Sequence, residues 1–247
     1  MAGSNSELRD RRQLAASAWS AFVQRGDGRG AVVRPEILSS WERSGAAISP
    51  GVTEAPLADE SETSSVWKGS PLQVAVERIE QELRSTAEDG DLVVAVTDAD
   101  TRILWTYGGR VMRRKAETVN FVAGGRWDES SVGTNALALA SRSGRPSMVH
   151  NWVCWAAPVF DPVTGEQLGV IDLSTTWDRT HPIGLATARM MARLIETAMP
   201  EHRHGPGTNS PPSALRRCET SAFSVDSVTD WSPYSRACSC TEVRPSG

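Results

Sequence analysis

The stretch best suited to ligand binding is 127–140, where a polar loop with one glycine runs directly into small and apolar residues. Asp128 and Ser130 carry oxygens that can accept hydrogen bonds from the free N–H groups of a helix start. Gly133 allows the backbone to come close to a bound molecule. An ordinary capped helix is the alternative. The pattern predicts the mouth of a pocket lined by Trp127, Ser130, Gly133, Thr134 and Asn135.

Two residues outside this stretch are candidates for the same pocket. Trp155 lies in the β-like run 152–160, where its large indole could form a pocket wall or belong only to the core. Asp172 lies in the strongly apolar run 167–174. A buried carboxylate needs a hydrogen-bond partner, which could be a backbone N–H or Arg126. We therefore include Trp155 and Asp172 among the predicted ligand-binding residues.

The elements that would position these residues follow from hydrophobic periodicity and turn signals. We predict a helix over 71–89, a hairpin of 91–98 with 101–106, a short helix over 110–119, a strand over 121–123, a helix ending near 143, a hairpin of 152–160 with 167–174, and a closing helix over 182–199. Antiparallel strands flanked by helices make an α+β fold.

The rest of the chain divides by composition. Helical spacing of apolar residues predicts amphipathic helices over 6–25 and 34–44. Ser, Thr, Pro and Glu dominate the segment that follows, and periodicity disappears from residue 205 onward. We predict an N-terminal helical extension (1–47), a linker (48–70), a compact domain (71–200) and a disordered C-terminal tail (201–247).

The charge balance excludes some classes of partner. The chain of 247 residues has 26 basic and 30 acidic side chains and a net charge of −4, so it offers no overall attraction to nucleic acid or to an anionic membrane. No run approaches the roughly 20 apolar residues that cross a bilayer. The polar N-terminus is no signal peptide, and the four cysteines form neither a disulfide framework nor a zinc pair. We expect a cytoplasmic protein.

Four segments together resemble a known family. Residues 34–44, 127–140, 156–159 and 169–174, in this order, resemble the sensory region of acetoin-catabolism-regulator-like bacterial transcription factors, which carry a GAF domain. The resemblance covers about 34–199. It implies a GAF-like antiparallel sheet flanked by helices, with a small-molecule pocket between the sheet and 127–135. It also implies a role in transcription regulation by signal sensing rather than catalysis.

The resemblance implies partners as well. We expect a small-molecule ligand of unknown identity and a homodimer formed through the outer helices. The connection from Pro146 to Trp152 is shorter than the family pattern, which would leave the pocket open. The tail lacks a helix-turn-helix pattern, so we expect DNA contact only indirectly or through a domain missing from this chain. A structural dimerisation module with a collapsed pocket is an alternative.

An enzymatic alternative rests on Cys154, because some GAF proteins reduce methionine sulfoxide with cysteines. Cys154 has no resolving cysteine nearby in sequence, and apolar burial would raise its pKa, so a packing role is favoured. His150 and His181 lack a Cys, Asp or His at ligand spacing. We find no nucleophile–base pair, phosphate loop or metal cluster in the sequence. We therefore expect no enzyme activity, no cofactor and no metal.

Overall fold

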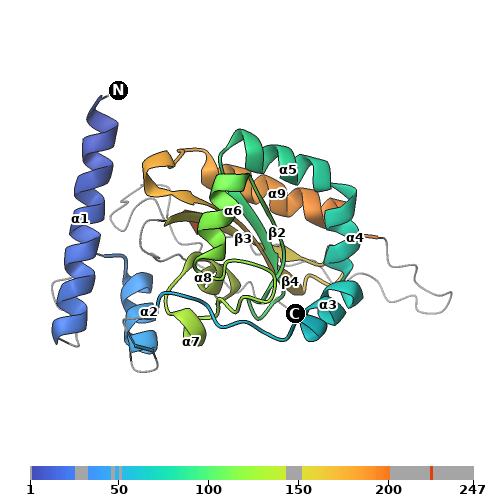
Figure 1. The fold of residues 1–247 in the computed structure, drawn as a ribbon, viewed down its shortest axis with the longest axis horizontal. Coiled ribbons are helices and arrows are strands. Elements are labelled where there is room, and N and C mark those ends of the chain that lie inside the picture. The colour runs from blue at the N-terminus through green and yellow to red at the C-terminus, as the bar shows by residue number, and fades with distance from the viewer. Residues whose placement is uncertain are drawn as a thin grey trace, which may run out of the picture.

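The centre of the computed structural model is an antiparallel sheet. The structure describes residues 2–25, 33–45, 48–49, 52–142, 152–200 and 223–224. Within these ranges the strands are β1 (Val93–Thr97), β2 (Ile103–Gly108), β3 (Trp152–Phe160), β4 (Gln167–Thr176) and β5 (Phe223–Ser224). Their order is β2-β1-β4-β3-β5, and every neighbouring pair is antiparallel (Figure 1). The expected α+β class is confirmed.

Both predicted hairpins are present, and each turn is closed by an aspartate. In the β1–β2 turn the Asp98 carboxylate accepts hydrogen bonds from the backbone N–H groups of Asp100 and Arg102. In the β3–β4 turn the Asp161 carboxylate accepts from the N–H groups two and three residues later. Such local bonds satisfy turn backbone groups that no strand partner reaches. The hairpins therefore bring Asp172 and the residues of β3 side by side.

One face of the sheet is covered by α4 (Pro71–Arg78), α5 (Glu80–Asp89) and α9 (Gly184–Ala198). The single helix expected over 71–89 is in fact two. Ile79 leaves helical geometry, with φ −116° and ψ 18°, and is itself buried. Leu72 and Leu83, in the separate helices, are fully buried in the same core. The break lets each helix follow the twisted sheet.

The opposite face carries α6 (Arg110–Glu117), α7 (Glu129–Val132) and α8 (Ala136–Arg142), with a second apolar core. The strand expected over 121–123 is wrong. Asn120 has φ +56°, and the N–H of Phe121 bonds to the carbonyl of Ala116, which turns the chain back under α6. The helix expected to end near residue 143 is α8, and Gly133, which has φ +77°, separates it from α7.

The linker expected over 48–70 contains a helix, α3 (Glu60–Gly69). Its first turn is acidic, and the Asp59 carboxylate accepts hydrogen bonds from the N–H groups of Ser61 and Glu62. These features stabilise a helix start even where apolar residues are few. The segment is thus part of the folded body and not a free connection.

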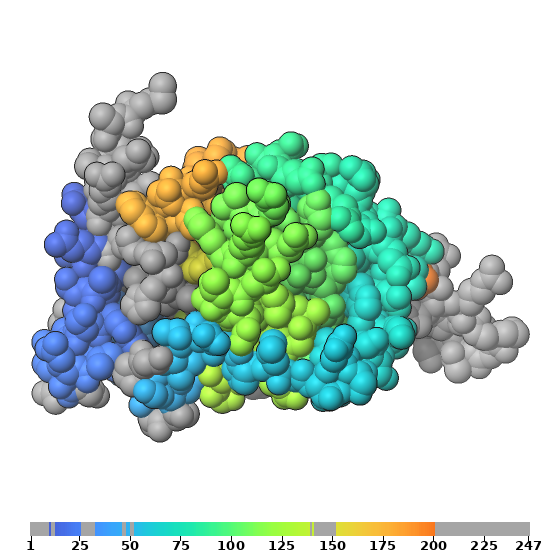
Figure 2. Space-filling view, viewed as in Figure 1, coloured from blue at the N-terminus to red at the C-terminus, as the bar shows by residue number. Residues whose placement is uncertain are grey.

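The two predicted N-terminal helices are α1 (Ala2–Arg25) and α2 (Pro35–Gly45). They meet through aromatic rings: the centroid of Trp41 lies 5.1 Å from that of Trp19 and 5.5 Å from that of Phe22. In Figure 1 α1 lies at one end of the molecule, with α2 between it and the sheet. Figure 2 shows the chain after α2 running along the lower edge beside the yellow-green residues of the α7 region.

Two expectations fall on undescribed residues. The short connection before Trp152, apart from Trp152 itself, lies outside the described ranges. So does the tail 201–247, except for Phe223–Ser224, which form β5 beside Trp155 and Ala156. None of the helices in the described part is long and apolar enough to cross a membrane.

Candidate functional site

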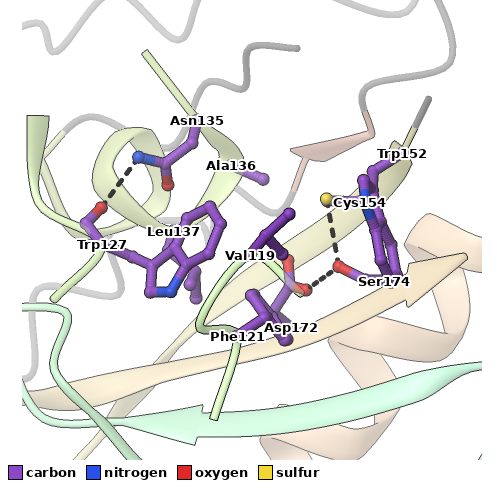
Figure 3. A pocket seen from close by; sticks show the side chains of 10 residues that line it. All are labelled: Val119, Phe121, Trp127, Asn135, Ala136, Leu137, Trp152, Cys154, Asp172 and Ser174. Atoms are coloured by element: carbon purple, nitrogen blue, oxygen red, sulfur yellow. Dashed lines mark hydrogen bonds between the residues drawn. The ribbon is translucent and has the colours of Figure 1, made fainter. Parts of the chain in front are cut away.

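A small cavity lies between the sheet and α8. Its volume is about 20 Å³, which is enough for about one ordered water molecule. The lining side chains come from β3, β4, α8 and the loop before α7 (Figure 3). Most of them are apolar. They are Val119, Phe121, Trp127, Asn135, Ala136, Leu137, Trp152, Cys154, Asp172 and Ser174.

Asp172 is the charged group of this lining. It lies in the middle of β4, opposite Ala95 of β1 and Ala156 of β3, and all three residues are fully buried. The two alanines have short side chains, so the space above the carboxyl group is not filled from the neighbouring strands. The sequence therefore places an acid on the floor of an apolar cavity.

The two carboxyl oxygens of Asp172 have different surroundings. Oδ2 accepts a hydrogen bond from the Ser174 hydroxyl, whereas Oδ1 has no partner among the described residues. Ser174 Oγ also lies 3.0 Å from Cys154 Sγ, as the dashed lines in Figure 3 show. Burial raises the pKa of Asp172 to about 7, and the bond from Ser174 acts in the opposite direction.

Asn135 fixes the wall above this floor. Its amide donates to the carbonyl oxygens of Trp127 at 2.8 Å and Gly133 at 2.9 Å, and its Oδ1 accepts from the N–H of Ala138 at 3.0 Å. The last bond caps α8. The Trp127 indole N–H donates to a backbone carbonyl 3.3 Å away. Both side chains are therefore held by the protein itself, and Asn135 has used both of its N–H donors.

Asp128 begins α7, as its position predicted. Its carboxylate accepts a hydrogen bond from the N–H of Ser130 at 2.9 Å, and the hydroxyls of Ser130 and Ser131 donate to it as well. Partial burial raises the pKa of Asp128, but these hydrogen bonds outweigh it and the pKa is lowered overall. The Ser130 side chain is exposed and serves this cap, so it does not reach the cavity.

The outer side of residues 127–135, which we call the rim segment, is bound to α2. Glu129 is 6% exposed and receives two hydrogen bonds from Arg43, at 3.0 and 2.9 Å. The Ser40 hydroxyl donates to Glu129 and lies 2.6 Å from Thr134 Oγ1. Ser44 Oγ lies 3.3 Å from the same Thr134 atom. We call these five residues the α2–rim cluster.

The α2–rim cluster was missed by sequence reasoning. A signal did exist. Ser40 and Ser44 are one helical turn apart, on the side of α2 that also buries Ile37 and Trp41. Buried serines on an apolar helix face predict a polar partner elsewhere in the chain.

Of the predicted site residues, Trp127, Asn135 and Asp172 line the cavity. Thr134 belongs to the α2–rim cluster, and Gly133 supplies the positive φ between α7 and α8. The expected partner Arg126 is 44% exposed and lies 3.9 Å from a glutamate of α3, so it is not the group that bonds Asp172.

The position predicted for Trp155 is wrong. Side chains of a strand alternate between faces, and Trp155 lies with Val153 in the core under α9, on the side of the sheet away from the cavity. A Cβ atom on Gly184 of α9 would lie 2.3 Å from the indole. The neighbours Trp152 and Cys154 face the cavity instead.

Metal and thiol chemistry find little support in the described part of the chain. No group of three His, Cys, Asp or Glu side chains there is arranged to hold a metal ion. His181 is exposed, and its Nδ1 accepts a long hydrogen bond from the N–H of Ile183, while His150 lies outside the described ranges. Cys154 Sγ contacts the hydroxyl of Ser174.

Comparisons with known proteins find bacterial regulators. No family model matches the chain. It is 29% identical over 195 residues to the acetoin dehydrogenase operon transcriptional activator AcoR of Bacillus subtilis. It is 25% identical over 194 residues to the propane 2-monooxygenase operon transcriptional activator MimR of Mycolicibacterium smegmatis. The chain is similar to bacterial operon activators. These matches cover 73% and 74% of the chain but 32% of each activator.

Two further matches extend the comparison. An uncharacterized 47.3 kDa protein of Rhodococcus erythropolis is 34% identical over 154 residues, which cover 58% of the chain and 35% of that protein. The chain therefore spans about a third of the length of the curated relatives that it matches. The fold is similar to that in the crystal structure of the E. coli DhaR(N)–DhaL complex, with a TM-score of 0.60, 22% identity and coverage of 66% of the chain and 60% of that one. The expected GAF-like architecture fits this fold.

Proposed function

We propose that this chain is the small-molecule-sensing region of a bacterial transcriptional activator, and that its ligand binds in the cavity above Asp172. The observation that carries the proposal is the buried Oδ1 atom of Asp172, which faces a cavity and has no partner among the described residues. An unpaired buried polar atom costs free energy, about 1–3 kcal/mol. A ligand that bonds this atom would recover part of that cost.

The relatives support a small ligand. AcoR and MimR are named for operons that encode acetoin dehydrogenase and propane 2-monooxygenase, enzymes of small, uncharged molecules. The cavity has room for about one water, so its walls must move apart to admit a ligand of that size. We propose that the module is not catalytic, because the relatives that it matches are named as transcriptional activators.

The rim segment offers a route by which binding reaches the rest of the regulator. Its inner side lines the cavity through Trp127 and Asn135, and its outer side bonds α2 through Glu129 and Thr134. We propose that a ligand changes the position of this segment and therefore the attachment of α2. Contact with DNA would then be indirect, made by another part of the regulator.

A cavity-filling variant tests the ligand site. In Ala136→Leu the larger side chain should occupy the cavity and abolish binding of small uncharged compounds, measured by ligand-observed NMR and by chemical-shift changes of the protein amides. Ala136 lines the cavity, whereas Ala186 is exposed on α9, so Ala186→Leu is the matched control. Equal binding by both variants would refute this location.

A second candidate function is structural dimerisation. The small cavity volume favours it, because a domain with little room for a ligand can still serve as a contact between chains. This candidate predicts a stable dimer by sedimentation and no shift of the cavity amides with any compound. Binding that Ala136→Leu abolishes would contradict it.

A further inference from the structure

We infer that one face of the domain, formed by α5, β2 and α6, binds a second copy of this chain, with the acidic α5 of each protomer against the basic α6 of its partner. This contact goes beyond the proposed function, because it lies on the outer surface and needs no ligand. The homodimer expected from the sequence had no assigned helices, and the charges on α5 and α6 supply them.

The two helices carry opposite charge on their outer sides. α5 has four acidic side chains and one arginine, whereas α6 has four basic side chains and one glutamate. Each helix buries two apolar residues one turn apart, Leu83 and Ala87 in α5 and Met112 and Ala116 in α6. The charged side chains are therefore directed outward. The fully exposed ones are Glu82, Glu88 and Asp89 on α5 and Arg110, Arg113, Arg114 and Lys115 on α6.

Only part of this charge is neutralised within the chain. On α5 the Glu80 carboxylate lies 2.6 Å from the Arg84 guanidinium. On α6 Arg113 lies 3.7 Å from Glu117. Other side chains of the two helices have no ion pair or side-chain hydrogen bond among the described residues, namely Glu82, Asp89, Arg110 and Arg114. Such charges attract a surface of the opposite sign.

Both helices lie beside the same end strand of the sheet. α5 packs on one face of the sheet and α6 on the other, and both contact β2. The Arg84 guanidinium of α5 lies 4.2 Å from the centre of the Tyr107 ring in β2. α6 begins at Arg110, two residues after the end of β2. Figure 1 shows both helices beside β2, and Figure 2 shows their residues on one face of the molecule. An acidic and a basic surface are therefore neighbours on this face.

This arrangement is complementary to itself. A two-fold axis that lies in the face, between the two helices, places each α5 opposite the α6 of the partner, so the attractive contact is made twice. A contact of α6 with α6 would bring like charges together and is disfavoured. The helices have 10 and 8 residues, each with one side exposed, whereas a standard interface uses about 20–30 residues a side. We therefore expect a weak dimer.

Salt dependence is the first test. Exposed ion pairs weaken as salt shortens the range of their attraction. In sedimentation equilibrium of the full chain, the dimer dissociation constant should rise about tenfold between about 50 mM and about 500 mM NaCl. A chain that stays monomeric at about 1 mM, where even weak contacts are populated, would overturn the inference. So would a dimer whose dissociation constant does not change with salt.

Charge reversal is the decisive test. In Arg110→Glu/Arg114→Glu both helices are acidic, and in Glu82→Lys/Asp89→Lys both are basic. Each variant alone should dimerise at least about tenfold more weakly than the wild type, because like charges then meet twice in the dimer. An equal mixture of the two should form a heterodimer, since each α5 again meets an α6 of opposite sign. A chain with all four changes should dimerise as well.

The mixture also shows that both reversed variants are folded, because misfolded chains would not restore association. Glu166→Lys is the control: Glu166 is exposed in the turn before β4, which is two strands from β2, and its reversal should leave the dissociation constant unchanged. Reversed variants that dimerise like the wild type, or a mixture that stays monomeric, would overturn the inference. Ligand-dependent shifts of the cavity amides should survive in both reversed variants, so the proposed function is tested separately.

Discussion

Replacing Arg43 with methionine tests whether the α2–rim cluster holds α2 against the domain. The change keeps an unbranched, flexible side chain, although a shorter one, and removes two charged hydrogen bonds to Glu129. The side chain of Glu129 is 6% exposed, whereas that of Arg43 is 48% exposed. A charged hydrogen bond contributes about 1.5–3 kcal/mol when buried. Solvent screening at Arg43 reduces this, so we expect α2 opening to become easier by about 2 kcal/mol.

The suitable assay is amide hydrogen exchange, because α2 can open without unfolding the sheet. Amides of α2 should exchange faster in Arg43→Met while those of β4 keep their protection. Arg113→Met is the matched control: its 3.7 Å pair with Glu117 is 62% and 54% exposed, so its loss should change exchange by less than about 0.5 kcal/mol.

The coupling between the two charges distinguishes this pair from a general packing defect. In a double-mutant cycle with Glu129→Gln, we expect the two changes to be non-additive by about 1 kcal/mol. Strict additivity, or an Arg43→Met effect equal to that of Arg113→Met, would refute the role given to the α2–rim cluster.

Two further predictions concern the sheet. The folded pKa of Asp172 is raised from 3.8 to about 7, so the folded state holds the proton more tightly and the free energy of unfolding should fall as pH rises through this interval, by at most about 4 kcal/mol. Asp172→Asn should lack this decline in urea titrations at pH 4 and pH 8, and parallel profiles would contradict the burial of the acid. Gly184→Ala should lower the free energy of unfolding by about 1–3 kcal/mol, since the added Cβ would lie 2.3 Å from the indole of Trp155. Gly69→Ala meets nothing within 4 Å and should not destabilise the protein; equal effects of the two changes would argue against the Trp155 contact.

Local signals predicted most of the sheet. Aspartates at 98 and 161 mark turns whose hydrogen bonds are made within a few residues, so the hairpins could be recognised without knowledge of the rest of the fold. Asp172 was identified in the same way, because an acid in an apolar strand is unusual whatever surrounds it. The loop at Phe121 was not, since its course depends on the positive φ of Asn120.

The errors at the site arise from contacts that are distant in sequence. Residues 153–159 are apolar on both sides of β3 and are buried by helices on both faces of the sheet. The alternation of polar and apolar residues, which normally shows which side of a strand faces the core, is therefore missing. For this reason Trp155 was assigned to the wrong side. Glu129 receives its partner from a residue 86 positions earlier. Local spacing carries no information about such a pair.

The alanines on either side of Asp172 affect the depth of the cavity but not its polar groups. Ala95 and Ala156 determine the depth of the floor but contribute no polar side-chain atom. Exchanging either for valine would shorten the space for a hydrocarbon chain and leave the carboxyl group and Ser174 in place. Single substitutions on the neighbouring strands would thus change the depth of the cavity without changing its polar groups.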